Sequence, residues 1–175
     1  TFYELDPQVR PLAEAHFTFL RSSKATITHV LGDARLTLQR TPERRFDVLV
    51  MDAFQSDFVP THLLTREAMA IELARVKSDG VLLFQVSNRL FRLAPFLAAV
   101  AQTQGLSARV RTGPKDGEGP LAEFHHQSIW VAVGSKETLD SWVPGWITPE
   151  IADQVWTDDR VDLFDRAVLE PHAVA

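Results

Sequence analysis

The chain has 175 residues, 45% of them hydrophobic and 23% charged, which predicts one globular domain that can bury a core of its own. Its formal net charge of −5 argues against a nucleic-acid partner, because the phosphates of such a partner favour a basic surface. The absence of cysteine excludes disulfides and cysteine-ligated zinc, and without a signal peptide or an apolar run near the roughly 20 residues of a membrane span, a cytoplasmic domain is expected.

The first part of the chain alternates short apolar runs with helical patterns. Thr1–Leu5 predicts a strand, and Asp6 then predicts the cap of an amphipathic helix with proline at its first position. Ala25–Leu31 predicts a second strand and Ala34–Arg40 a short helix. Phe46–Met51 is a nearly unbroken apolar run, which predicts a strand buried on both faces of a parallel sheet.

The alternation continues through the middle of the chain. Thr65–Val76 predicts a helix that Thr65 caps, Gly80–Val86 predicts a buried strand, and the apolar spacing from Leu93 to Ala101 predicts the next helix. Two late strands are predicted over Ala108–Thr112 and Ser128–Gly134 without a helix between them. These two strands are expected to form an antiparallel hairpin at one edge of the sheet.

The remaining residues are less regular. Lys136–Ser141 predicts a short helix, and the tail that follows is irregular apart from a helix expected over Pro149–Val155. The predicted organisation is an α/β domain over residues 1–141 and an irregular tail over residues 142–175 that packs on it or trails from it. Strand–helix alternation with apolar strands predicts a doubly wound, mostly parallel, Rossmann-like sheet.

Acidic residues follow three successive predicted strands. Glu4, with Asp6 two residues on, ends the first strand, Asp33 follows the second, and Asp52 follows the third. Doubly wound sheets bind ligands at the carboxyl ends of their strands, where such carboxylates can accept hydrogen bonds from ribose hydroxyls and an adenine amine. Each residue taken alone also fits a structural role, as a helix cap or the start of a loop.

The segments that carry these carboxylates resemble a known family. Phe2-Tyr3-Glu4-Leu5-Asp6-Pro7, Gly32-Asp33-Ala34 and Phe46-Asp47-Val48-Leu49-Val50-Met51-Asp52 resemble the spermidine synthase (aminopropyltransferase) family within the class I methyltransferase fold. The resemblance covers roughly residues 2–103.

Further segments resemble one branch of that family, the spermidine-synthase-like bacterial proteins that are often fused to membrane domains. These segments are Asp52-Ala53-Phe54-Gln55-Ser56-Asp57, His62 to Ala68, Val86-Ser87-Asn88-Arg89 and Trp156-Thr157-Asp158-Asp159. A membrane domain attached to the intact protein is therefore an open alternative. Taken alone, Asp158-Asp159 is typical of a solvated turn.

The resemblance implies a donor site. The donor would be S-adenosylmethionine or decarboxylated S-adenosylmethionine, with no metal. Glu4, with Asp6 close to it, would hold the ribose, and Asp33 with Ala34 would hold the adenine.

The resemblance also implies a site for a small-molecule amine. Asp52 would be the catalytic residue, because a carboxylate in reach of an amine can orient it and accept its proton. Asp57 would bind the cationic amine. His62 stands beside this predicted site, where it can assist proton transfer or serve only as a structural residue at a helix start.

The sequence departs from the family in two respects. The acids Asp52 and Asp57 stand further apart than in the family's Asp-x-x-Asp motif, and the family's glycine-rich first strand and loop are not in this chain. In the family fold that strand lies between the strands at Thr1–Leu5 and Phe46–Met51. A chain lacking it must close the gap, borrow a strand from a second copy as a homodimer, or expose unpaired edges.

Three functions follow as alternatives. The first is transfer of an aminopropyl or methyl group from an S-adenosyl donor to an amine, as in polyamine biosynthesis. The second is an ordinary small-molecule methyltransferase, which the same carboxylates would serve. The third is a catalytically silent module that binds a nucleoside or merely folds as a partner domain. The adjacent residues His125-His126 are not read as a metal site, because neighbouring residues of a strand point to opposite faces.

Overall fold

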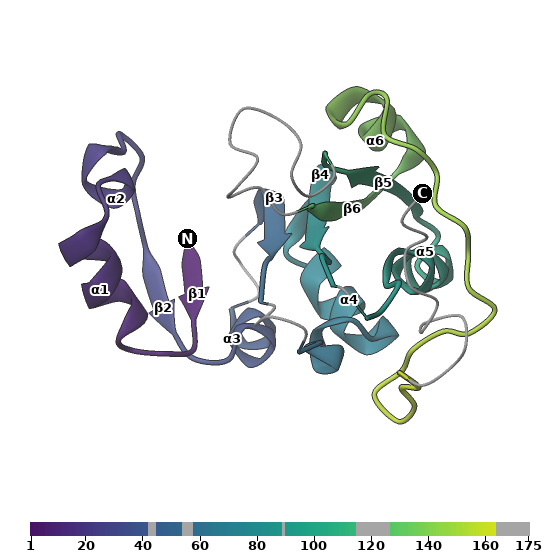
Figure 1. Cartoon of the computed structure of the whole chain (residues 1–175), viewed down its shortest axis with the longest axis horizontal. Coiled ribbons are helices and arrows are strands. Elements are labelled where there is room, and N and C mark those ends of the chain that lie inside the picture. The colour runs from purple at the N-terminus through teal and green to yellow at the C-terminus, as the bar shows by residue number, and fades with distance from the viewer. Residues whose placement is uncertain (42–44, 54–57, 89, 115–126, 164–175) are drawn as a thin grey trace. The chain divides into compact units, whose positions relative to one another are not determined.

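The structure is a computed structural model that describes residues 1–41, 45–53, 58–88, 90–114 and 127–163 (Figure 1). The chain divides into two compact units, Thr1–Arg44 and Arg45–Ala175. Within the described residues each unit contains its own sheet, with two strands in the first unit and four in the second. The predicted division into residues 1–141 and 142–175 stays a prediction.

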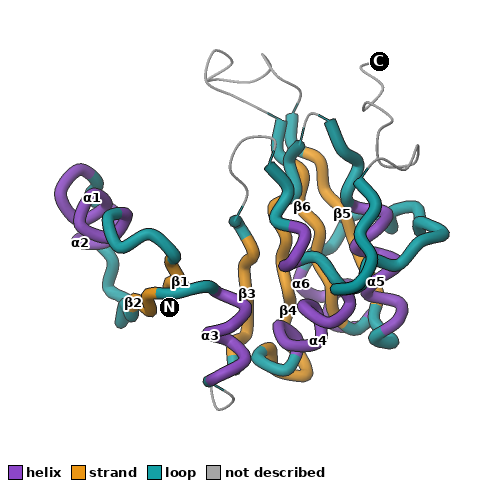
Figure 2. Tube along the Cα trace, turned by 90° about the horizontal axis from the view of Figure 1, so that it is seen from below, coloured by secondary structure: helices purple, strands orange, loops and turns teal. Residues whose placement is uncertain are grey.

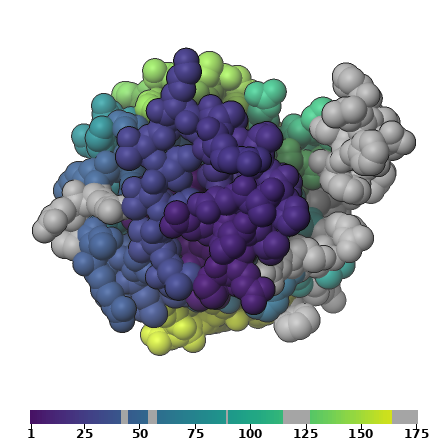
Figure 3. Space-filling view, turned by 90° about the vertical axis from the view of Figure 1, so that its left-hand side faces the viewer, coloured from purple at the N-terminus to yellow at the C-terminus, as the bar shows by residue number. Residues whose placement is uncertain are grey.

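The N-terminal unit contains two short parallel strands and three helices. Its elements in chain order are β1 (Phe2–Glu4), α1 (Val9–His16), α2 (Phe19–Ser22), β2 (His29–Leu31) and α3 (Ala34–Arg40). The register pairs Phe2 with His29 and Glu4 with Leu31, so both strands end at the same level. Figure 3 shows the surface of this unit in purple and dark blue.

The N-terminal unit has little core of its own. Leu38 is its only buried apolar side chain among the described residues, whereas Leu5 is 70% exposed and Leu31 63% exposed. Its cohesion therefore rests on strand pairing, helix hydrogen bonds and local turns more than on apolar burial.

The C-terminal unit is built around a four-stranded mixed sheet. Its elements in chain order are β3 (Phe46–Met51), η1 (Thr61–Leu63), α4 (Arg66–Leu73), β4 (Val76–Gln85), α5 (Ala94–Thr103), β5 (Ser107–Thr112), β6 (Ile129–Gly134) and α6 (Lys136–Trp142). The strand order is β3-β4-β6-β5, as Figure 2 shows in orange. β3 and β4 are parallel, and β6 is antiparallel to both β4 and β5. The predicted antiparallel hairpin at one sheet edge is therefore confirmed.

Helices cover both faces of this sheet, as a doubly wound fold requires. Figure 1 shows α6 on one side of the strands and α4 and α5 on the other. On the α6 side, Val81, Ala132 and Leu139 form a buried cluster. Leu82 and Phe84 alternate with Val81 along β4, so they point to the opposite face, and both are fully buried.

The segment after α6 packs on the C-terminal unit without regular structure. Ile147 pairs with Val110 of β5 in an isolated antiparallel bridge. The prediction of a helix over Pro149–Val155 is wrong. The Ala152 N–H donates instead to the carbonyl of Pro95 at 3.1 Å, so a tertiary bond uses a backbone donor that a helix would have kept.

β4 begins earlier than the sequence predicts. The predicted helix to Val76 ends at Leu73, and β4 begins at Val76 rather than at Gly80. Gly80 marks a close approach between strands rather than a strand start, because a Cβ there would lie 2.6 Å from the Asp47 carbonyl oxygen. The pairing of β3 with β4 also shifts register between Phe46 and Val48.

β3 is not buried on both faces as predicted. It pairs with β4 on one side and with no other strand of the described residues. Its side chains alternate, with Leu49 and Met51 buried while Val48 and Val50 are 36% and 48% exposed. Among the described residues β1 likewise pairs only with β2, so β1 and β3 belong to separate sheets.

The close approach at Gly80 gives a stability prediction. Replacing Gly80 with alanine places a methyl group against the Asp47 carbonyl and a Val76 methyl at 2.7 Å, which forces the strands apart. We expect Gly80→Ala to lower the free energy of unfolding by about 1–3 kcal/mol in urea denaturation. Ser78→Ala, on the exposed part of the same strand, is the control and should stay near wild type. Equal stability of the two variants would contradict the close approach.

Candidate functional site

The carboxylate of Glu4 lies at the end of β1 and takes part in a local turn. Its Oε1 accepts the Asp6 N–H at 3.0 Å, whereas no described residue donates to Oε2. Asp6 is not the N-cap that the sequence predicts, because α1 begins at Val9 after Gln8. Its Oδ1 accepts the Gln8 N–H at 2.8 Å, so Asp6 holds the turn that leads into the helix. Glu4 thus keeps one oxygen that can accept from ligand hydroxyls.

Asp33 lies at the end of β2, beside Glu4. The Gly32 N–H donates to the Glu4 carbonyl at 2.9 Å, which joins the two strand ends. Gly32 has a φ of +136°, a conformation that glycine adopts without strain and that turns the chain toward α3. The Asp33 side chain accepts the Leu36 N–H at 2.9 Å and so caps α3, which begins at Ala34. The N-terminal unit therefore brings Glu4, Asp33 and Ala34 to one edge of its strand pair.

Asp52 lies in the C-terminal unit, directly after β3. Met51 pairs with Phe84, so Asp52 stands level with the end of β4, at the carboxyl edge of the sheet. Its side chain is exposed, and no hydrogen bond or ion pair to it is formed by the described residues. This is the position in which a carboxylate can meet a ligand without first breaking a protein contact.

The residues that follow β4 at the same edge are engaged in structure. The Ser87 hydroxyl accepts the Ile129 N–H at 2.9 Å and the Gln85 amide at 2.7 Å. The Asn88 side chain is buried and accepts the backbone N–H groups of Leu90 and Phe91. Ser87 and Asn88 therefore build the turn after β4 rather than present free polar atoms.

The chain returns from this edge through η1, which holds His62. The neighbours Leu63 and Leu64 are buried at 4% and 2% exposure, whereas His62 itself is exposed. Asp57, the second acid expected at the amine site, lies outside the described residues, as do Arg89 and His125-His126.

The predicted site residues fall into two sets. Glu4, Asp6, Asp33 and Ala34 lie in the N-terminal unit, and Asp52 and His62 lie in the C-terminal unit. Asp52 and the residues of the first set lie at or just beyond the carboxyl ends of parallel strands in their own sheets, whereas His62 lies in η1. The described part of the chain holds no group of three His, Asp or Glu side chains arranged to bind a metal ion. None of the helices described has the length and apolarity that a bilayer crossing requires.

A pocket at the carboxyl ends of β4 and β5 was not predicted from the sequence. It has a volume of about 280 Å³, and its walls include Val86, Thr112, Ile129 and the start of α5 at Ala94. Its remaining wall comes from residues 147–150, where Glu150 pairs with Arg92 at 3.2 Å. No sequence pattern links the walls of this pocket, because the ion pair between Arg92 and Glu150 joins residues that are 58 positions apart.

The capping role of Asp33 gives a prediction. Asp33→Ala removes the acceptor of the Leu36 N–H, and we expect a loss of about 1 kcal/mol in the free energy of unfolding. Asp33→Asn keeps an oxygen in that position and should be nearly neutral in the same urea titration. If asparagine destabilised the protein as much as alanine, the negative charge rather than the cap would be the stabilising feature.

Comparison with known proteins supports the resemblance found in the sequence. No family model matches the chain. The chain is 37% identical over 81 residues to a polyamine aminopropyltransferase of Vibrio vulnificus (strain CMCP6), a match that covers 45% of this chain and 26% of that protein. The chain thus spans about a quarter of the length of this curated relative.

A solved structure shows the same fold. The crystal structure of a probable spermidine synthase from Corynebacterium glutamicum ATCC 13032 superposes with a TM-score of 0.56 at 16% identity, over 87% of this chain and 63% of that one. MnmC2 from Aquifex aeolicus superposes with a TM-score of 0.43 at 16% identity, over 86% of this chain and 41% of that one, which is too weak to indicate a common fold. The chain has a Rossmann-like methyltransferase fold of the spermidine-synthase-like kind.

Proposed function

We propose that this spermidine-synthase-like chain is part of an enzyme that transfers an aminopropyl or methyl group from an S-adenosyl donor to a small-molecule amine. The observation that carries the proposal is the pair of acidic residues at the adjacent carboxyl ends of β1 and β2. The 2.9 Å bond from the Gly32 N–H to the Glu4 carbonyl keeps Glu4 and Asp33 at neighbouring strand ends. Two carboxylates at such ends match the hydrogen-bonding needs of a nucleoside.

The nucleoside would bind through acceptors on the N-terminal unit. The Oε2 atom of Glu4 is open to ribose hydroxyls, because no described residue donates to it. The Asp33 segment, with Ala34, would lie against the adenine. Asp6 would support Glu4 indirectly, since its own backbone N–H donates to the Glu4 carboxylate.

Asp52 would act on the amine. The amine must be neutral at nitrogen for its lone pair to attack the carbon bonded to the sulfonium of the donor. The new C–N bond forms as the C–S bond breaks, the electron pair of that bond leaves on a neutral thioether, and the proton released from nitrogen passes to Asp52. The exposure of Asp52 and its lack of described partners support this role.

The other amine contacts remain proposals. Asp57 follows Asp52 by five positions in the sequence, and a carboxylate there would attract a cationic amine. His62 would assist at the same site, and none of these roles uses a metal ion. A homodimer, an attached membrane domain and a cytoplasmic location also stay predictions.

Two other functions are alternatives. A small-molecule methyltransferase would use the same donor carboxylates with a different acceptor. A silent nucleoside-binding or partner module is favoured by a specific observation, because Asp33 and Asp6 already serve as hydrogen-bond acceptors for local backbone groups. Donor binding distinguishes the silent partner module from both enzymes, and the acceptor then distinguishes the enzymes from each other.

Calorimetry of the full-length protein tests donor binding. We expect heat of binding with S-adenosylmethionine or methylthioadenosine, and weaker binding by Glu4→Gln, because an amide replaces the carboxylate that would accept from the ribose hydroxyls. A diamine titrated after the nucleoside tests the acceptor site. No heat with either nucleoside would remove both enzyme functions.

Substitution of Asp52 tests its role as proton acceptor. We expect Asp52→Asn to lower kcat for amine transfer by about 10²-fold or more, because an amide cannot take the proton. Asp153→Asn changes an exposed aspartate without described partners and serves as the matched control. Undiminished amine transfer by Asp52→Asn would show that another group is the base.

A further inference from the structure

The pocket at the carboxyl ends of β4 and β5 has a floor that belongs to the sheet. Thr112 of β5 lies opposite Ile129 of β6, and the Val86 N–H donates to the Ile129 carbonyl at 2.8 Å. Val110 lies two residues before Thr112 along β5 and therefore points to the same face. Val86, Val110 and Ile129 are buried, so the sheet holds the floor of the pocket in place before any ligand binds.

The walls of the pocket are the start of α5 and residues 147–150 of the tail, by which we mean residues 143–163. The tail is fastened on both sides of this stretch. Ile147 exchanges two backbone hydrogen bonds with Val110 of β5, at 2.7 and 3.1 Å. The Ala152 N–H donates to the carbonyl of Pro95 in the first turn of α5. The two walls are therefore joined to each other as well as to the sheet.

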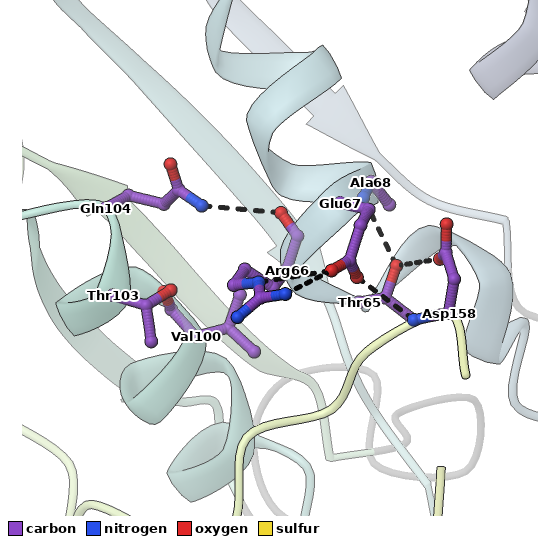
Figure 4. Close-up of polar contacts among 8 residues, drawn as sticks. All are labelled: Thr65, Arg66, Glu67, Ala68, Val100, Thr103, Gln104 and Asp158. Carbon is purple, nitrogen blue, oxygen red and sulfur yellow. Dashed lines mark hydrogen bonds and ion pairs between the residues drawn. The ribbon is translucent and has the colours of Figure 1, made fainter. Parts of the chain in front are cut away.

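The tail is anchored again beyond the pocket. Trp156 is 2% exposed and stacks on Phe96 of α5, with ring centroids 5.0 Å apart. The Thr65 hydroxyl at the start of α4 donates to Asp158 Oδ1 at 2.7 Å (Figure 4). Because these contacts hold the tail on the C-terminal unit, the wall that the tail forms is present without a ligand. A preformed site loses less conformational entropy on binding than one that must first be ordered.

One ion pair supplies the charge of the pocket. Arg92 and Glu150 are the charged members of the described lining, and the Arg92 guanidinium donates to Glu150 Oε2 at 3.2 Å. The side chain of Arg92 is 31% exposed, whereas that of Glu150 is 80% exposed. An ion pair with so exposed a partner contributes little to stability, because water solvates the carboxylate well when the pair is broken.

This difference in exposure favours an anionic ligand. Glu150 can turn into solvent at little cost and leave the guanidinium of Arg92 to a ligand carboxylate, which matches its planar fork with two parallel hydrogen bonds. A cationic ligand on Glu150 would instead stand beside the less exposed Arg92 and be repelled by it. The pocket volume of about 280 Å³ equals the liquid volume of about nine water molecules, which fits a ligand of about ten non-hydrogen atoms.

We propose that this pocket binds a small carboxylate with an apolar body. The ligand carboxylate replaces that of Glu150 on Arg92, and the apolar body packs on the floor of the pocket. Glu150 is then an internal competitor that occupies the site when the ligand is absent. Glu4, Asp33 and Asp52 are not among the described residues of the lining, so the proposal does not depend on the proposed transfer reaction.

Calorimetry of the full-length protein with small probes tests the ligand class. Benzoate and isovalerate carry an aromatic and an aliphatic body, and we expect at least one of them to bind with a Kd of about 1 mM or lower. Benzamide and isovaleramide lack the charge, benzylamine reverses it, and all three should bind about tenfold more weakly or not at all. Failure of both carboxylates to bind would overturn the proposal, as would equal binding of the amides or stronger binding of benzylamine.

Substitution of the two ion-pair partners should have opposite effects on the binding of the carboxylate probe. Arg92→Leu removes the cation and should weaken binding about tenfold or more. Glu150→Gln removes the competitor and should strengthen binding about two- to fivefold. Arg109→Leu is the matched control, because Arg109 pairs with Asp140 at 3.1 Å and points to the opposite face of the same sheet. Weaker binding by Glu150→Gln would overturn the proposal.

A variant that keeps the charge guards against a loss of folding in Arg92→Leu. Arg92→Lys retains a positive charge without the planar fork, and it should bind the carboxylate probe with an affinity between those of wild type and Arg92→Leu. Binding no better than that of a folded Arg92→Leu would overturn the proposal. Glu150→Gln alters only an exposed side chain, so its result decides the question even if Arg92→Leu does not fold.

Methyl NMR locates the bound probe. Addition of the carboxylate should shift the methyl signals of Val86, Val110 and Ile129, which line the pocket. The methyl signals of Val81 and Leu139, in the buried cluster on the α6 face, should stay in place and also report whether each variant is folded. Binding with shifts confined to residues outside the pocket lining would overturn the assignment of the site.

Discussion

The parallel pairing of β3 with β4 is the constraint on which the C-terminal unit depends. β4 is bound on its other side by β6, and its residues Val81, Leu82 and Phe84 are among the most deeply buried of the chain. Because the pairing sets Met51 against Phe84, the strands end together and Asp52 emerges at the carboxyl edge of a rigid sheet. The turns through η1 and the cap of α4 then return the chain to the core. The pairing of the strands therefore sets the position of any site on this edge.

The acidic residues of the N-terminal unit have structural roles at the same strand ends where the proposed nucleoside would bind. Asp33 caps α3 and Glu4 closes a turn, yet both stand where a doubly wound sheet receives its ligand. These local bonds restrain the carboxylates, which would reduce the entropy lost if the proposed nucleoside binds there. The structural roles of these residues and their proposed binding roles are therefore compatible. Substitutions must be tested both for the free energy of unfolding and for ligand binding to distinguish the two.

Sequence patterns predicted those elements whose cause is local. The strand over Phe46–Met51 and the helix over Ala34–Arg40 have the predicted bounds, because apolar runs and caps act within a few residues. The bounds of β4 and the conformation of the segment after Pro149 differ from the predictions. The close approach at Gly80 and the hydrogen bond from Ala152 to Pro95 are tertiary effects, which local sequence patterns do not contain. The strand-end placement of Glu4, Asp33 and Asp52 followed from the parallel topology. The hydrogen bond from Thr65 to Asp158 could not be predicted, because Asp158-Asp159 is locally typical of a solvated turn and Thr65 is 93 positions away.

At the carboxyl edge of the C-terminal sheet, exposed and buried positions differ in how well they tolerate substitution. The connections after β3 and β5 both leave the sheet at this edge, and the connection after β3 contributes Val59 and Leu64 to the buried apolar residues. Exposed positions there, such as Asp52, can change at little cost in folding free energy, whereas changes at Val59 or Leu64 would disturb the core packing. Such an architecture lets a lineage vary the exposed edge of the sheet while its scaffold stays under separate selection. The hydrogen bond from the Thr65 hydroxyl to Asp158 limits that freedom, because it ties the end of the connection after β3 to a residue 93 positions further along the chain.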